Sequence, residues 1–160
     1  MKLKKTSITN YRCFKEAEID FDEHTTLIVG KNGAGKTAIL DAVAVAISTF
    51  LLGIDGGVSR SISKDDARYE FYDLDGTVDP QHQFPVSIES TGDCLDNHDL
   101  KWVRSLNSES GNTTVKEARE LTNISKNTQK RIMTGDKSLI LPLISYYGTG
   151  RLYADRKSVV

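Results

Sequence analysis

Apolar and polar residues alternate along two stretches near the N-terminus, and a period of two is typical of half-buried β-strands. In 17–21 apolar residues occupy every second position, with Glu18 and Asp20 between them, and 3–9 follows a looser alternation. These stretches predict an antiparallel strand pair. A third run, 25–29, is apolar on both sides of its pleat, which predicts a central strand covered on both faces.

After residue 36 the apolar residues recur at spacings of three and four, which is typical of a helix with one apolar face. No Gly or Pro interrupts the run before Gly53, and this glycine predicts the end of the helix. The predicted apolar stripe consists of Ile39, Leu40, Val43, Ala46, Ile47, Phe50 and Leu51.

The second half of the chain begins with a change in composition. Residues 53–83 have no sustained period and are rich in Gly, Ser and Asp, which predicts an irregular insertion with short pieces of structure. Next, 84–90 and 100–106 predict a hairpin with an acidic connecting loop, 92–99. The spacing of the three Asp and one His in this loop fits neither a calcium nor a zinc pattern, so we expect a solvated turn.

Two further elements complete the predicted α/β fold. Thr114 and Glu117 have the spacing of a capping box, and the apolar residues after them predict a second helix that ends near Gly135. Residues 138–147 are almost continuously apolar, which predicts a buried strand with Pro142 near its start or at an edge position.

Composition narrows the class of protein. A chain of 160 residues is long enough for one domain with its own core. The net charge of −1 and the pI of about 6.3 favour neither nucleic acid nor an anionic membrane as a partner. No apolar run has the length of a membrane span or of a signal peptide, so we expect a cytoplasmic protein. Cys13 and Cys94 lack metal-ligand spacing, and we expect free thiols.

The segment between the third predicted strand and the first helix carries the candidate chemistry. Residues 30–37 match the phosphate-binding loop pattern G-x-x-x-x-G-K-[ST] at every specified position. Backbone N–H groups at the start of a helix converge on a phosphate, and the helix dipole favours the anion. We expect Gly30 and Gly35 to adopt φ values closed to other residues, and the missing Cβ atoms of Gly33 and Gly35 to let phosphate approach the backbone.

Each part of the loop has an expected role toward ATP and Mg²⁺. Lys36 is the predicted catalytic group, with its ammonium on the β- and γ-phosphates, and the Thr37 hydroxyl is the predicted metal ligand. A Gly-rich turn with a solvated lysine is the alternative interpretation, although a chance match to the octet is rare. The residues predicted to bind the nucleotide are Gly30, Lys31, Asn32, Gly33, Ala34, Gly35, Lys36, Thr37 and Ala38.

Three segments together resemble the N-terminal ATPase lobe of the ABC-type SMC/RecF/OLD group. They are Asn10-Tyr11-Arg12-Cys13-Phe14, the stretch 27–42 that contains the phosphate loop, and the stretch 141–151 with the sequence LPLISYYGTGR. Within the group the chain is similar to bacterial AAA family proteins described as predicted ATP-binding proteins involved in virulence, relatives of anti-phage defence ATPases. The resemblance covers nearly the whole chain, but only the phosphate loop is a highly specific motif.

The resemblance implies a P-loop NTPase fold with a curved mixed sheet, and a head-to-head homodimer that completes each nucleotide site. It implies that Arg12 helps to hold the phosphates, whereas a surface position at a strand end is the alternative. Related ATPases carry a γ-phosphate-sensing Gln near the position of Tyr147-Gly148, where this sequence has none. Their Walker B acids, signature loop and switch His are also absent. We therefore expect 1–160 to be the N-terminal nucleotide-binding lobe, with the rest of the ATPase outside this chain.

Three functions follow as hypotheses. The first is an ATPase lobe that binds ATP and Mg²⁺ but hydrolyses ATP negligibly by itself, because no acid is placed to activate water. The complete protein would hydrolyse ATP and act with nucleic acid or a nuclease partner, for instance in phage defence. The second is a small P-loop kinase that uses Arg60, Asp65, Asp66 and Arg68, and the third is a non-catalytic interaction module stabilised by nucleotide.

Overall fold

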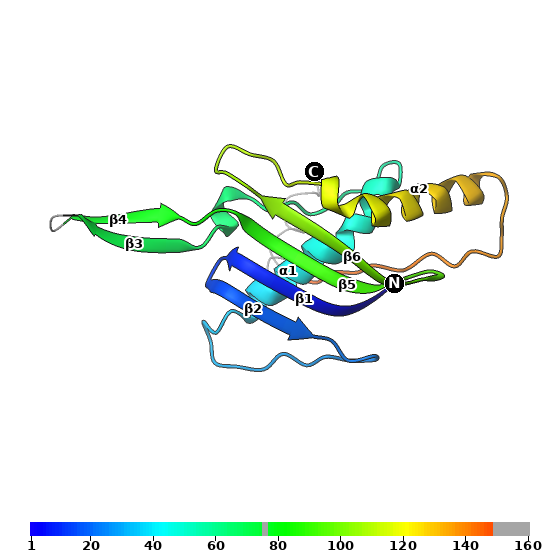
Figure 1. Cartoon of the computed structure of the whole chain (residues 1–160). Helices are drawn as coiled ribbons and strands as arrows, with labels where there is room; N and C mark the ends of the chain where they lie inside the picture. Colours follow the sequence, from blue (N-terminus) through cyan, green and yellow to red (C-terminus); the bar gives the residue numbers. More distant parts are fainter. Residues whose placement is uncertain (75–76, 149–160) are drawn as a thin grey trace, which may run out of the picture.

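A four-stranded antiparallel sheet forms the centre of the molecule, with the strand order β2-β1-β5-β6 (Figure 1). The computed structural model describes residues 1–74 and 77–148. The N-terminal strand pair and the later hairpin are confirmed, although most of their strands are longer than predicted. The bounds are Lys2–Tyr11 for β1, Phe14–Asp20 for β2, Val86–Cys94 for β5 and Asn97–Leu106 for β6.

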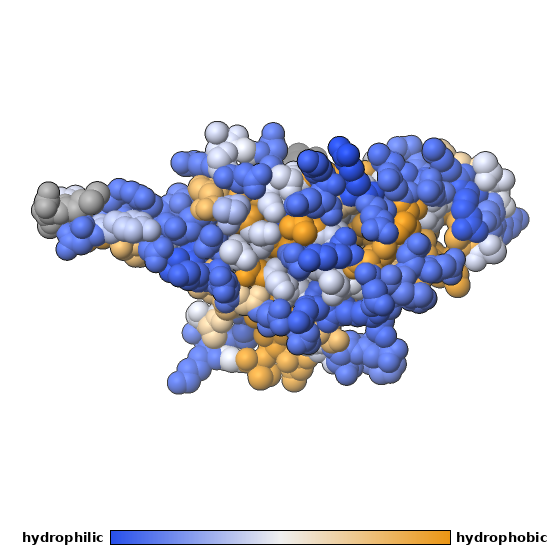
Figure 2. Space-filling model, in the orientation of Figure 1, coloured by the Kyte–Doolittle hydropathy of each residue, from blue (hydrophilic) through white to orange (hydrophobic). Residues whose placement is uncertain are grey.

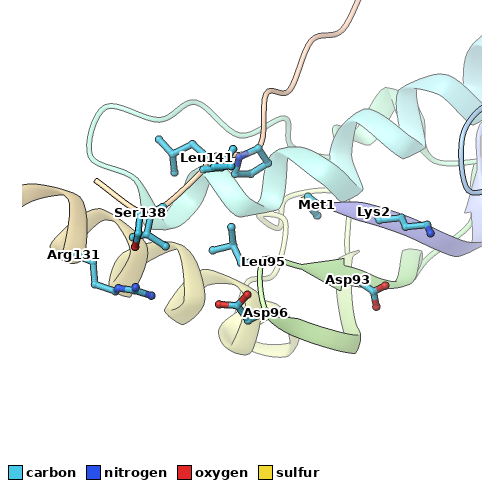
Figure 3. Close-up of a pocket in the computed structure, with 11 residues that line it drawn as sticks. Met1, Lys2, Asp93, Leu95, Asp96, Arg131, Ser138 and Leu141 are labelled. Carbon is cyan, nitrogen blue, oxygen red and sulfur yellow. The ribbon is translucent and has the colours of Figure 1, made fainter. Parts of the chain in front are cut away.

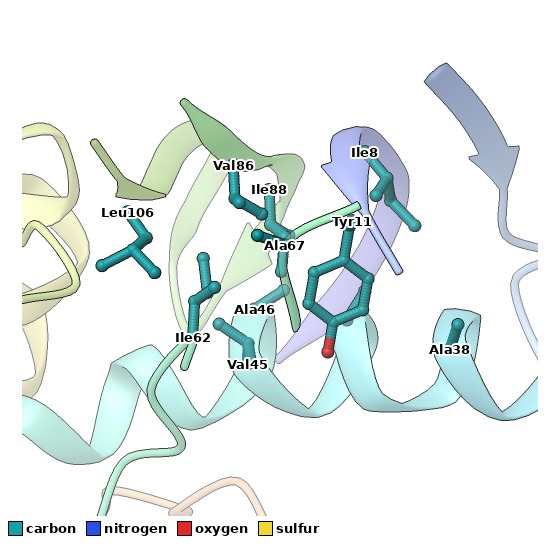
Figure 4. Packing of buried hydrophobic residues seen from close by; sticks show 11 residues of the cluster. Ile8, Tyr11, Ala38, Val45, Ala46, Ile62, Ala67, Val86, Ile88 and Leu106 are labelled. Atoms are coloured by element: carbon teal, nitrogen blue, oxygen red, sulfur yellow. The ribbon is translucent and has the colours of Figure 1, made fainter. Parts of the chain in front are cut away.

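The main core lies between this sheet and the first helix, α1. Alternate residues of β5 are buried, as expected of a strand with one face on the core. Ile8 of β1 pairs with Ile88 of β5, and Tyr11 extends this layer to the helix (Figure 4). A second apolar cluster contains Trp102 of β6 and Leu121 of the second helix, α2.

The helix that follows the phosphate loop is confirmed. α1 spans Lys36–Ser48 and continues as the 3₁₀ helix η1, Thr49–Gly53, so it ends at the predicted glycine. The predicted apolar stripe is partly wrong. The face on the sheet consists of small residues such as Ala42 and Val45, whereas Leu40 is 47% exposed on the opposite face. Small residues let the helix lie close to the sheet, and the Trp102 indole N–H donates to the Ala46 carbonyl at 3.0 Å.

Residues 25–29 do not form the predicted central strand. Leu27 and Val29 are 81% and 77% exposed, and the segment lies in an extended form without regular pairing. A strand requires a hydrogen-bonded neighbour, and among the described residues the sheet consists of β2, β1, β5 and β6 without the 25–29 segment. Ile28 alone turns inward, into a groove that it lines with Leu40 and Val43 of α1.

The predicted buried strand at 138–147 is wrong for the same reason. The described structure assigns no strand there, and Ile140 and Leu143 are 86% and 95% exposed. The segment instead runs back along the molecule after α2 (Figure 1).

The region predicted to be irregular contains a hairpin that the sequence pattern missed. After the short 3₁₀ helix η2, Lys64–Asp66, the strands β3, Tyr69–Leu74, and β4, Thr77–His82, form a separate two-stranded sheet. This hairpin projects from the body of the molecule (Figure 1).

The second helix is confirmed, but its predicted cap is wrong. The 3₁₀ helix η3, Lys116–Ala118, leads into α2, Arg119–Met133, and no side chain caps either of them. The Thr114 hydroxyl instead accepts a hydrogen bond from the Ser105 backbone at 3.1 Å. Gly135, with φ 90°, follows the helix end as predicted.

One stretch of the described chain, α1 with η1, is long and apolar enough to cross a membrane by length and composition. It is 56% buried inside the molecule. Because a core helix meets the same criteria, this finding is weak evidence for a membrane span.

Candidate nucleotide site

The phosphate loop is an exposed turn at the N-terminus of α1. Gly33 and Gly35 adopt φ values of 82° and 86°, and the Ala34 N–H donates to the Lys31 carbonyl at 3.2 Å. The expectation of a positive φ is therefore confirmed at Gly35. At Gly30 it is wrong, since positive φ occurs at Gly33 instead. Gly33 and Gly35 are separated by Ala34, which has no positive φ, and left-handed residues in such a turn can direct successive backbone N–H groups toward one side, as in an anion-binding nest.

The ammonium of Lys36 is held over this turn. Its Nζ donates to the carbonyls of Gly30 at 2.7 Å and Lys31 at 2.8 Å. Two carbonyl contacts orient the charge across the mouth of the loop rather than out into solvent. An incoming phosphate would thus meet an ammonium that is already positioned.

The start of α1 is available to an anion. No side chain caps the helix, and its first turn contains no acidic residue. A Cβ at Gly33 would meet nothing within 4 Å, so the outer side of the loop is open. Thr37 lies in the first turn and is exposed. These features fit a polyphosphate, and the Thr37 hydroxyl would supply one Mg²⁺ ligand beside phosphate oxygens and water.

The β1–β2 turn supports the loop from its inner side. A Cβ at Gly35 would lie 2.5 Å from Cζ of Phe14 and 2.7 Å from Sγ of Cys13. Only a glycine permits this approach, because real Cβ contacts are not so short. Cys13 is an exposed free thiol, as expected, whereas the other free cysteine, Cys94, is buried in the second apolar cluster.

Arg12 occupies the same turn, and its guanidinium is bound by two carboxylates. Its Nε donates to Asp66 at 2.8 Å, and its Nη1 donates to Asp41. Burial alone would lower the pKa of Arg12, but the hydrogen bond to Asp66 and nearby negative charges raise it. The residue has φ 51°, a strained value for a non-glycine residue. Strain of this kind is concentrated at functional sites, although the structure gives Arg12 carboxylate partners rather than a phosphate.

Asp41 of α1 is a site residue that sequence reasoning missed. It is 4% exposed and accepts hydrogen bonds from Arg12 and from the Tyr146 hydroxyl, and its Oδ1 lies 3.0 Å from Nη2 of Arg60. The Arg60 guanidinium also lies over the Tyr146 ring, 5.3 Å from its centroid. Burial, followed by the hydrogen bond to Asp41, raises the pKa of Tyr146. A charged residue in an apolar helical run was the available signal, since a buried charge needs partners.

A metal site built from side chains requires clustered His, Cys, Asp or Glu residues. The described residues contain no group of three or more of these that could hold a metal ion. The predicted acidic loop 92–99 is shorter than expected, because β5 extends to Cys94 and β6 begins at Asn97, and Asp93 at the end of β5 is paired with Lys4 at 2.7 Å. A cavity of about 510 Å³ lies beside this loop, lined by Lys2, Asp96 and Arg131 among others (Figure 3). Because Lys2 begins β1 and Arg12 follows its last residue, Tyr11, this cavity is at the opposite end of β1 from the turn that supports the phosphate loop.

Comparisons with known proteins place this site in a family. Residues 5–159 match the family described as AAA domain. The DNA replication and repair protein RecF of Flavobacterium johnsoniae is 54% identical over 43 residues, which cover 27% of this chain and 12% of RecF. The DNA double-strand break repair Rad50 ATPase of Archaeoglobus fulgidus is 48% identical over 44 residues, 28% of this chain and 5% of Rad50. The chain thus matches only a small part of the length of either relative.

A solved structure from work on ATP-driven dimerization and DNA-stimulated activation of SMC ATPases also aligns with the chain. It has a TM-score of 0.48 and 17% identity, and the alignment covers 89% of this chain and 87% of that one. The family match includes the strand pair, the phosphate loop and α1. The chain therefore belongs to the AAA domain family, with the P-loop NTPase fold, and part of it is similar to RecF and Rad50.

Proposed function

We propose that this chain binds ATP with Mg²⁺ through residues 30–38 and is the phosphate-binding part of an ABC-type ATPase. The family supports ATP binding in general terms. The observation that carries the proposal is the Lys36 ammonium held over the left-handed turn at Gly33 and Gly35. Lys36 would neutralise the β- and γ-phosphates, backbone N–H groups would bind their oxygens, and Thr37 would hold the metal.

Hydrolysis by the chain alone would be negligible. Phosphoryl transfer requires a group that orients the attacking water. Among the described residues the buried carboxylate nearest the loop in sequence, Asp41, is already bound by two guanidinium groups and a phenol. We propose that the complete protein supplies the missing acid and hydrolyses ATP as a head-to-head homodimer in the cytoplasm.

The biological role of ATP hydrolysis by the complete protein is also a proposal. The relatives are described as DNA replication and repair and double-strand break repair proteins, which favours nucleic acid or a nuclease as the partner, and phage defence as one setting. The kinase hypothesis lacks support in the structure. Two of the residues that it requires are engaged elsewhere, since Arg60 binds Asp41 and Asp66 binds Arg12.

Titration calorimetry with a non-hydrolysable ATP analogue and Mg²⁺ tests the proposal. Removing the Lys36 ammonium by Lys36→Ala should cost about 1.5–3 kcal/mol, or roughly ten- to a hundredfold in affinity. Lys126→Ala is the matched control, because Lys126 is an exposed lysine of α2, which packs on η1 at the opposite end of α1 from the loop. Equal affinity of the wild type and Lys36→Ala would refute the assignment.

A further inference from the structure

The β3–β4 hairpin is an arm that is fixed at its base. The Arg68 N–H donates to the Asn10 carbonyl at 2.9 Å, and the Gln83 N–H donates to the Arg68 carbonyl at 2.8 Å. A bridge between Tyr11 and Ala67 ties the same point to β1. Beyond this base, β3 and β4 pair only with each other within the described chain. The arm is therefore presented to solvent from a rigid support (Figure 1).

One face of the arm carries most of its exposed apolar side chains. Cross-strand pairing places Phe71 opposite Pro80, and Val78 opposite Asp73, so that these side chains share a face with the Tyr69–His82 pair. Phe71 is 69% exposed, Val78 62% and Tyr69 47%. We name this set of Tyr69, Phe71, Val78 and Pro80 the apolar face of the arm. The side of the arm that is visible in Figure 2 is mostly hydrophilic, so the hairpin has two faces of different character.

The arm is also anionic. Its described strands carry Glu70, Asp73 and Asp79 and contain no Lys or Arg. The cation paired with Glu70 is Arg68 at the base, at 3.5 Å, and Asp79 accepts a hydrogen bond from the Gln81 amide. A surface with this charge repels the phosphates of nucleic acid and of anionic lipid. It repels a second copy of the arm as well.

We propose that the arm docks into a protein partner whose apolar cleft is bordered by Lys or Arg residues. Contiguous apolar patches on a soluble protein mark interaction sites, and an isolated two-stranded hairpin is marginally stable without packing on its face. Phe71 and Val78 are the anchors for the cleft, since buried aromatic side chains dominate interface energetics. The Asp73 carboxylate lies on the same face as these anchors and meets the basic border, while Glu70 and Asp79 on the opposite face add negative charge that speeds encounter. This interaction does not depend on nucleotide binding.

The test is selection of a random 12-residue peptide library, displayed on phage, against the complete chain. Clones that also bind Phe71→Ser/Val78→Ser are removed. The expected consensus combines Lys or Arg with aromatic or large aliphatic residues. A synthetic peptide of that consensus should bind Phe71→Ser/Val78→Ser at least tenfold more weakly than wild type, and Glu70→Lys/Asp79→Lys about threefold to tenfold more weakly.

Two matched controls define the specificity. Val58→Ser/Ile140→Ser removes two equally exposed apolar side chains elsewhere, and Glu16→Lys/Glu117→Lys makes the same charge change away from the arm. Both should bind the peptide as wild type does, and all variants should keep the wild-type thermal midpoint.

Four results would overturn the proposal. The first is an acidic consensus, and the second is a consensus that binds the arm variants and the wild type equally. The third is self-association in sedimentation velocity that Phe71→Ser/Val78→Ser abolishes, which would make a second copy the occupant. The fourth is binding of a 20-mer DNA that the same variant abolishes. If Phe71→Ser/Val78→Ser does not fold, the charge-reversal variant and its control decide between these outcomes.

Discussion

Gly35→Ala should destabilise the protein more than Gly33→Ala, and the difference measures how tightly the β1–β2 turn supports the phosphate loop. Both glycines have nearly the same positive φ, 86° and 82°. A side chain at such a φ costs roughly 1–2 kcal/mol, of which about 0.4–1 kcal/mol is regained because alanine restricts the unfolded chain. The Cβ added by Gly33→Ala has no further cost from steric contact, since no atom lies within 4 Å of it.

At Gly35 a steric term is added. The new Cβ would lie 2.5 Å from the Phe14 ring and 2.7 Å from the Cys13 sulfur. Overpacking of this kind costs typically 1–3 kcal/mol. The two variants should therefore differ by about 1–3 kcal/mol in the free energy of unfolding from urea titration. For a chain of this size the difference corresponds to roughly 2–12 °C in the thermal midpoint. Equal losses in the two variants would refute the contact between the turn and the loop.

Two further substitutions test the core and the acid sensitivity of the fold. The buried Tyr11 hydroxyl has no hydrogen-bond partner among residues 1–74 and 77–148, and burial raises its pKa. Tyr11→Phe should therefore raise the free energy of unfolding by about 1 kcal/mol in urea titrations, and a lower free energy of unfolding would contradict this assignment. The Lys4 ammonium, and then the Asp99 backbone N–H, lower the pKa of Asp93 to about 2 from 3.8. The ionised Asp93 carboxylate therefore stabilises the folded state above pH 3.8, and this stabilisation is lost as the pH falls toward 2. Asp93→Asn should therefore flatten thermal stability against pH in that window, and an unchanged slope would contradict the pairing.

Local patterns predicted those elements whose partners lie close in the sequence. β1 and β2 are joined by a tight turn, as are β5 and β6, so alternation alone identified both hairpins. Residues 25–29 and 138–147 have equally strong apolar runs, yet they are not strands. A run of apolar residues shows that a segment can be buried. Whether the segment forms a strand depends on a hydrogen-bonded neighbour from a distant part of the chain, and the run itself does not indicate that neighbour.

The β3–β4 hairpin was missed for a different reason. Tyr69 and Phe71 alternate with polar residues, and Asp75-Gly76 in the sequence is a typical hairpin signal. The many acidic residues and Pro80 obscured that signal, because both are depleted in strands. Pro80 is tolerated in a two-stranded sheet, where each strand has a free edge.

The candidate site was predicted in part because its residues are contiguous. The glycines and Lys36 follow from one octet of sequence, and their geometry agrees with it apart from the φ of Gly30. The network around Asp41 joins residues 12, 41, 60, 66 and 146. Sequence spacing does not predict such a network, since it depends on four separate segments meeting at α1. Phosphate binding by Arg12 stays a prediction from the resemblance, since its described partners are Asp41 and Asp66.

The central claim is that backbone N–H groups and the Lys36 ammonium at the start of α1 bind a polyphosphate. The most direct measurement is the set of backbone amide NMR shifts of the ¹⁵N-labelled chain during titration with an ATP analogue and Mg²⁺. The account predicts that the largest shifts fall on residues 33–38 and that Lys36→Ala needs roughly ten- to a hundredfold more nucleotide to reach them. Shifts confined to other regions, or none at saturating nucleotide, would contradict it.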